Sequence, residues 1–237
     1  MTDTTQLYLE DSELRSFEAT VEAVSGDRVV LDRTAFYPEG GGQPADHGWL
    51  YGPEGRDWRV TDVQKGAEIF HHVEGEPPEA GTTLTAELDW DRRHAHMRYH
   101  TAQHLLSAVL LEEFDAETTG NQLYEDRARL DCAYPRFEDD DLDRIEERVN
   151  EYVERSIPVD WYTLDREEAE EQLDPERTRL ELLPDSITEV RLVEITGVDR
   201  TACAGTHVSN TEEVGEFVVT GRETRGSEEE RVRFELR

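Results

Sequence analysis

Two short motifs, far apart in the chain, most constrain how it can fold. His100 and His104 stand four residues apart in a segment whose apolar residues have helical spacing. Since an α-helix has about 3.6 residues per turn, both imidazoles fall on one face, one turn apart. Cys203 and His207 repeat this offset in a glycine-containing loop after an apolar, strand-like segment. Imidazole and thiolate suit tetrahedral Zn²⁺, so we expect the helix and the loop to meet around one ion.

The histidine pair does not indicate a metalloprotease. That class needs a glutamate directly after the first histidine as its general base, and Thr101 occupies this position. If all four residues ligate at once, the coordination is closed, as in a structural zinc site; a catalytic ion needs one ligand to leave or the coordination to expand. The sequence leaves both states open. A catalytic ion would polarise an ester carbonyl, lower the pKa of a bound water toward about 7, or orient a substrate through its amino group.

Three motifs, taken in order, resemble one known family. Residues 36–44 read FYPEGGGQP, residues 100–106 read HTAQHLL and residues 203–207 read CAGTH. Together they resemble the alanyl-tRNA editing family (AlaX proteins), which are free-standing relatives of the editing domain of alanyl-tRNA synthetase. The resemblance covers most of the chain, and 237 residues leave no room for the aminoacylation domain of a full synthetase.

The resemblance implies a zinc-dependent deacylase that hydrolyses tRNA(Ala) mischarged with serine or glycine. Such editing is needed because a pocket built for alanine cannot strongly reject a smaller or hydroxyl-bearing analogue. The implied cofactor is Zn²⁺, and no catalytic group is expected beyond a water on the metal. The implied metal ligands are His100, His104, Cys203 and His207; the implied substrate-binding residues are Thr118, Thr119, Gln122, Thr206, Gly41 and Gly42.

Most of these substrate-binding residues, and the function as a whole, also have other interpretations. Thr118, Thr119 and Gln122 are also typical of a turn that bonds its own backbone, and the glycine run 40–42 is also typical of a tight turn. The chain is alternatively a non-catalytic zinc module that binds tRNA. A third interpretation is a threonyl-type editing deacylase, whose zinc motifs are similar; the GGGQP segment favours the alanine side.

Acidity dominates the composition. Asp and Glu number 57 against 25 Lys and Arg, for a net charge of −32, and Lys65 is the only lysine. Periodic apolar segments and four Trp argue against disorder. The composition resembles that of salt-loving archaea, in which molar salt screens carboxylate repulsion within roughly 3 Å. This haloarchaeal hypothesis predicts a folded CD spectrum in molar KCl and loss of structure in dilute buffer.

A negative chain is an unusual partner for tRNA, which normally binds a basic face. Arginines nevertheless cluster in two places, 92–98 and 222–233. The expected partner is therefore still mischarged tRNA(Ala), and neither DNA nor a membrane is expected. The choice between monomer and weak dimer stays open.

Two cysteines are too few for a disulfide framework, no signal peptide is visible at the start, and no apolar run approaches the roughly 20 residues of a membrane span. We expect a reduced, cytoplasmic protein.

The pattern of elements predicts an α+β protein. Short strands with turns between them, from Ser16 to about Leu88, predict a small N-terminal β-barrel over residues 1–90, with Ser25-Gly-Asp as a hairpin turn. Residues 91–237 are expected to form the metal-binding editing domain, with helices packed on an antiparallel sheet. Asp91 is the expected cap of a helix that ends near Phe114, residues 117–122 read as a turn, and a second helix begins at Glu138.

Overall fold

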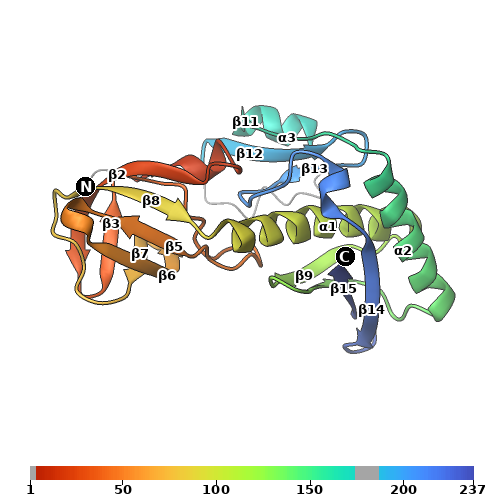
Figure 1. The fold of residues 1–237 in the computed structure, drawn as a ribbon. Coiled ribbons are helices and arrows are strands. Elements are labelled where there is room, and N and C mark those ends of the chain that lie inside the picture. The colour runs from red at the N-terminus through yellow and green to blue at the C-terminus, as the bar shows by residue number, and fades with distance from the viewer. Residues whose placement is uncertain (1–3, 174–186) are drawn as a thin grey trace. The chain divides into compact units, whose positions relative to one another are not determined.

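The computed structural model describes residues 4–173 and 187–237. The chain forms two compact units, Met1–Met97 and Arg98–Arg237, each of which is described separately below (Figure 1). Helix α1 (Trp90–Phe114) contributes residues to both. The division into domains 1–90 and 91–237 stays a prediction.

The first unit contains a closed six-stranded antiparallel barrel, as the strand pattern predicts. Its strands pair in the order β2-β3-β7-β6-β5-β8, and Ser25–Arg28 closes the β2–β3 hairpin. Closure leaves no free sheet edge. The bounds are β2 Ser16–Ser25, β3 Arg28–Leu31, β5 Gly48–Tyr51, β6 Asp57–Lys65, β7 Ile69–Val73 and β8 Thr83–Leu88; β1 (Thr5–Gln6) pairs in parallel with β4 (Arg33–Thr34), and short 3₁₀ turns cover Leu7–Leu9 and Pro53–Gly55.

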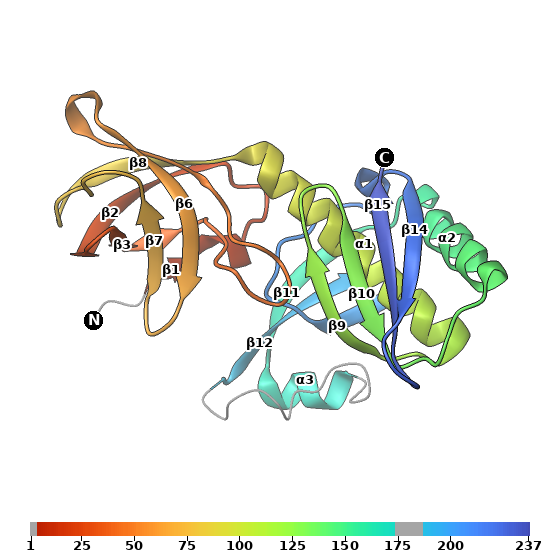
Figure 2. The same cartoon turned by 90° about the horizontal axis from the view of Figure 1, so that it is seen from below.

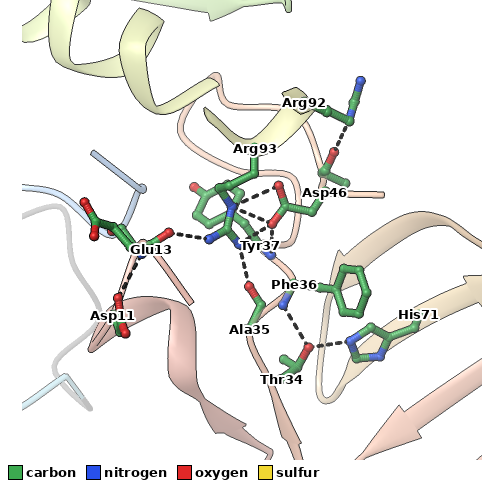
Figure 3. A network of polar contacts seen from close by, with 12 residues as sticks. Asp11, Glu13, Thr34, Ala35, Phe36, Tyr37, Asp46, His71, Arg92 and Arg93 are labelled. Carbon is green, nitrogen blue, oxygen red and sulfur yellow. Dashed lines mark hydrogen bonds and ion pairs between the residues drawn. The ribbon is translucent and has the colours of Figure 1, made fainter. Parts of the chain in front are cut away.

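A histidine lies in the barrel core. His71 is fully buried and its ring packs against Phe36. Its Nδ1–H donates to the Val29 carbonyl at 3.1 Å, and its Nε2 accepts from the Thr34 hydroxyl at 2.7 Å (Figure 3). Burial lowers the pKa of His71 to about 4. The ring is therefore neutral at pH 7 and serves as a packing and hydrogen-bonding group.

A buried ion pair fixes the loop that carries the glycine run. Arg93, in the first turn of α1, is fully buried and pairs with the fully buried Asp46. The guanidinium also donates to the carbonyls of Ser12 and Ala35, and Asp46 accepts from the Tyr37 amide at 2.7 Å (Figure 3). Because both charged groups are buried, removing one of them would leave the other charge uncompensated in the core. The segment 35–46 is thereby held to the start of α1 at both of its ends.

The second unit is built around the rest of α1. One sheet has the order β14-β15-β10-β9 and packs on α1 through Phe234, whose ring lies 5.9 Å from that of Tyr99 (Figures 1 and 2). A second sheet has the order β11-β12-β13. This arrangement confirms the α+β class. The bounds are β9 Thr118–Leu123, β10 Ala128–Cys132, α2 Asp139–Glu154, β11 Val159–Asp165, α3 Arg166–Gln172, β12 Glu189–Ile195, β13 Asp199–Ala202, the 3₁₀ turn Thr211–Val214, β14 Phe217–Thr224 and β15 Glu230–Leu236.

Helix α2 covers an edge of the four-stranded sheet. Glu138 and Asp141 form a capping box at its start, and Ile145 and Val149 lie on its buried stripe. The Asn150 side chain donates to the Phe217 carbonyl and accepts from the Phe217 amide. Edge strand β14 thus has backbone groups satisfied by the helix rather than left open to another chain.

Two local predictions are wrong. Residues 117–122 do not form a turn, because 118–123 pair with β10 as strand β9. Its polar residues lack an apolar alternation, so tertiary pairing overrides the local signal. The cap of α1 is Asp89, whose carboxylate accepts from the Arg92 amide, and Asp91 lies inside the first turn.

Among the described residues, no helix is long and apolar enough to cross a membrane.

Candidate metal centre

Helix α1 supplies the first two side chains of the site. The apolar residues Met97, Leu105 and Val109 are buried, so α1 runs through the interior and carries its histidines with it. His100 and His104 lie on one helix face, with ring centroids 5.2 Å apart. The four-residue spacing therefore places both imidazoles side by side, as predicted.

The loop after β13 supplies the other two. Cys203 and His207 follow the β12–β13 hairpin, and the ligand atoms of His100, His104, Cys203 and His207 all lie within 4.8 Å of one another. The Cys203 Sγ lies 3.6 Å from His100 Nε2 and 3.4 Å from His207 Nε2. All three histidines are buried and the cysteine is half-buried. The two distant motifs thus converge on one point.

Two of these distances fit a tetrahedral zinc ion, although the whole set of ligand atoms spreads up to 4.8 Å. With a Zn–S bond of about 2.3 Å and a Zn–N bond of about 2.0–2.1 Å, two ligand atoms of a tetrahedron lie about 3.6 Å apart. The two nitrogen–sulfur distances, 3.4 and 3.6 Å, match that value. The donor set of three imidazoles and one thiol also suits zinc better than the harder magnesium or calcium ions.

Hydrogen bonds orient two of the imidazoles. His104 Nδ1 lies 2.7 Å from the carboxylate of buried Asp199, and His207 Nδ1 lies 3.2 Å from the hydroxyl of buried Thr101. The Thr101 hydroxyl also accepts from the Val208 amide. Metal-binding histidines commonly bond a carboxylate or another polar group through their second nitrogen, which turns the first toward the ion. The Nε2 atoms are accordingly the ones turned toward the site.

The electrostatics of the cluster favour a cation. Burial alone raises the pKa of the Cys203 thiol, but the neighbouring His100 and His207 bring that pKa well below its ordinary value. Burial opposes the charge on His104, yet Asp199 and Cys203 raise the pKa of this imidazole to about 10. Burial and His100 lower the pKa of His207. A thiolate and a carboxylate therefore face the imidazoles, and an entering cation replaces protons.

Arg191 on β12 holds the ligand loop in place. Its Nη1 donates to the Cys203 carbonyl at 2.7 Å and to the Gly205 carbonyl at 3.1 Å. The Gly205 amide in turn points at the Cys203 sulfur at 3.4 Å. An amide donor aimed at the sulfur favours the thiolate, which is the ligand form.

Known proteins match the chain along almost its whole length. An alanyl-tRNA editing protein AlaX-M from Methanosarcina barkeri is 42% identical over 98% of this chain and 99% of that protein. Another AlaX-M from Saccharolobus solfataricus is 36% identical over 99% of each. The chain belongs to the alanyl-tRNA editing protein family. This confirms the resemblance seen in the three motifs.

Matches outside the free-standing editing proteins fit the same assignment. The alanine–tRNA ligase of Pyrococcus abyssi is 40% identical over 98% of this chain but only 26% of the ligase. The family described as "tRNA synthetases class II (A)" matches residues 4–92. The "Threonyl and Alanyl tRNA synthetase second additional domain" matches residues 190–233, which include the loop with Cys203 and His207.

The substrate-binding residues predicted for this editing protein lie in several places. The Thr118 hydroxyl bonds Ser107 of α1 at 2.7 Å, and Thr119 donates to Glu229 at 2.9 Å. Gln122 donates to the Leu123 carbonyl, and Thr206 is fully buried between the two loop ligands in sequence. The remaining two, Gly41 and Gly42, belong to the first unit. Their roles in binding stay predictions.

The glycine run forms a tight turn in the first unit. Gly41 and Gly42 have φ values of 58° and 84°, which only glycine adopts readily. Two backbone hydrogen bonds between Gly40 and Gln43 close the turn. A Cβ added at Gly41 would meet no atom within 4 Å. The turn tip is therefore open, and its backbone can approach a partner closely.

Three polar residues of the site escape sequence-based reasoning. Asp199 and Thr101 contact the imidazoles, and the Asn121 side chain donates to Gln103 of α1 at 3.2 Å. Thr101 is visible in the sequence only as the residue that replaces a protease glutamate. Asp199 has no local signal, because it opens strand β13 and meets His104 only through the fold. Asn121 is missed because the sequence predicts a turn where strand β9 forms.

Proposed function

We propose that the chain deacylates tRNA(Ala) mischarged with serine or glycine, using Zn²⁺ at the centre formed by His100, His104, Cys203 and His207. The observation that carries this is the convergence of four zinc-type ligand atoms within 4.8 Å in a member of the alanyl-tRNA editing family. Mischarged tRNA(Ala) is the proposed partner, and the protein's own zinc ion is the proposed cofactor.

The residues around the centre have separate tasks in this proposal. Bound zinc supplies Lewis-acid chemistry at the aminoacyl ester. Asp199 keeps a proton on His104 Nδ1, so that Nε2 is the ligand atom. Arg191 holds the ligand loop through the carbonyls of Cys203 and Gly205. The ester is already activated, so positioning can replace the glutamate base that Thr101 does not provide.

Discrimination against correctly charged alanine requires a partner for the serine hydroxyl. A buried polar group left unpaired costs about 1–3 kcal/mol, which is enough to separate serine from alanine. Thr118, Thr119, Gln122 and Thr206 remain the proposed candidates, with the Gly41–Gly42 turn as a tRNA-facing element. Asn121 is a further candidate, because its side-chain amide donates to Gln103 of α1, the helix that carries His100 and His104.

The test is deacylation of three substrates at molar salt. Ser-tRNA(Ala) and Gly-tRNA(Ala) should lose their amino acid, and Ser-tRNA(Thr) should not. Replacing His104 by Ala should abolish both bound zinc and deacylation, while His94→Ala, on the same helix but outside the ligand set, should keep both. Turnover of Ser-tRNA(Thr) alone would indicate a threonyl-type deacylase. No turnover of any substrate would leave a binding module, and full activity in the zinc-free variant would remove the metal from the reaction.

A further inference from the structure

The four-stranded sheet of the second unit has one apolar and one charged face. Leu130, Val232 and Phe234 point to the side of α1 and are buried. On the other face, strand register places Arg129 opposite Arg233 and Asp131 opposite Arg231. Figure 2 looks onto this sheet with α1 behind it. The charged face is therefore the one turned away from α1.

A single carboxylate holds three guanidinium groups on this face. Asp131, 8% exposed, accepts from Arg231 Nε at 2.6 Å and Nη2 at 2.8 Å, and from Arg129 Nη1 at 2.7 Å. Arg225 approaches the same carboxylate at 3.5 Å. The sheet thus fixes three positive charges around one negative charge.

This cluster has more hydrogen-bond donors than its carboxylate can use. Each guanidinium carries five N–H donors, whereas a carboxylate has about four acceptor positions. Arg225 and Arg233 are also 43% and 45% exposed, so their remaining donors reach solvent. Planar guanidinium groups fit phosphate oxygens two donors at a time, which makes arginine the preferred residue for binding phosphate groups.

The acidic neighbours match the four arginines in number. Asp131 lies at the centre of the cluster, and strand alternation places the exposed Glu235 on the same face as Arg231 and Arg233. Glu223 pairs with Arg233, and Glu229 accepts from Thr119 at the strand end. In a chain of net charge −32, however, a surface on which arginines balance the acidic residues repels a polyanion less than the chain's average surface does.

We propose that Arg129, Arg225, Arg231 and Arg233, the arginine face, bind the phosphodiester backbone of the tRNA substrate. The inference rests on the proposed function and adds to it the surface that holds the nucleic acid. Asp131 is the positioning residue of this surface, because it fixes the guanidinium groups of Arg129, Arg225 and Arg231 before the tRNA arrives. Such contacts supply affinity for the phosphates and carry no base sequence information.

The test measures binding of uncharged tRNA(Ala) to the zinc-loaded full chain over a series of KCl concentrations. The double variant Arg225→Gln/Arg233→Gln should bind about tenfold more weakly at sub-molar salt, and the slope of log K against log salt should fall by about 2, or about 1 per arginine. Arg144→Gln is the matched control, because this exposed arginine of the same unit is ion-paired with Glu113 on the helices rather than on the sheet face. It should leave both quantities unchanged.

A second variant tests the opposite direction and guards against unfolding. Glu223→Gln removes the acidic partner of Arg233 and should tighten tRNA binding. Wild-type affinity and salt slope in the double variant, or in Glu223→Gln, would overturn the arginine face. Deacylation is read separately: a wild-type chain that binds tRNA(Ala) through these arginines but releases no serine would contradict the proposed function and leave the binding surface standing.

Discussion

Two buried histidines, one in each compact unit, have pKa values that their surroundings shift in opposite directions. His71 lies in the barrel core, bonded to a carbonyl and a hydroxyl, and burial lowers its pKa to about 4. His104 lies in the metal cluster, where burial acts in the same direction but Asp199 and Cys203 raise its pKa to about 10. Burial alone therefore does not separate a structural histidine from a ligand. Between these two histidines the negative partners of His104 make the difference, because they stabilise positive charge at the same place.

The largest expected effect concerns the pH dependence of the barrel. The pKa of His71 is 6.5 in the unfolded chain and about 4 in the folded one, so the unfolded state binds the extra proton between these values. Stability should accordingly fall as pH drops from 6.5 toward 4, by about 3 kcal/mol at about 1.4 kcal/mol per pKa unit. Urea unfolding of the zinc-loaded chain in molar KCl, at several pH values, measures this.

His71→Gln is the matched control, because an amide keeps polar contacts but does not titrate. Its unfolding free energy should lack the extra pH dependence in this window. Parallel curves for the wild type and His71→Gln would contradict a neutral, buried His71. In the metal-free chain His104 should act with the opposite sign, since its raised pKa adds stability below pH 6.5 that is lost as pH rises toward 10.

The second prediction removes the carboxylate beside His104, which makes the surroundings of this imidazole more like those of His71. Asp199→Asn removes the carboxylate but keeps an amide of the same size, so the pKa of His104 should fall and zinc should bind about 10–100-fold more weakly. Competition with a zinc-selective chelator measures the affinity. Unchanged affinity would mean that Asp199 only fills space beside the ring.

The smallest effect is expected where the partner is neutral. His207 is bonded to the Thr101 hydroxyl, which carries no charge. Thr101→Val should weaken zinc binding about fivefold, the worth of one ordinary hydrogen bond, and Thr101→Ser should restore it. A loss as large as that of Asp199→Asn would contradict the idea that the charge of the partner decides.

The sequence predicts those features that depend on local spacing. His100 and His104 share a helix face because the helix repeat dictates it, and the six barrel strands follow from short apolar segments between turns. What it does not predict depends on pairing across the chain. The residues of β9 are predicted as a turn because their strand conformation depends on pairing with β10. The Arg93–Asp46 pair joins residues that no local pattern connects. Asp199 belongs to this second group.

The central claim is that three imidazoles and one thiolate from distant segments hold a single zinc ion. X-ray absorption spectroscopy of the purified, zinc-loaded chain tests it most directly. We expect one zinc per chain with one sulfur at about 2.3 Å and nitrogen neighbours at about 2.0–2.1 Å, and loss of the sulfur signal in Cys203→Ala. A shell of oxygen and nitrogen alone in the wild type, or a sulfur signal that survives Cys203→Ala, would contradict it.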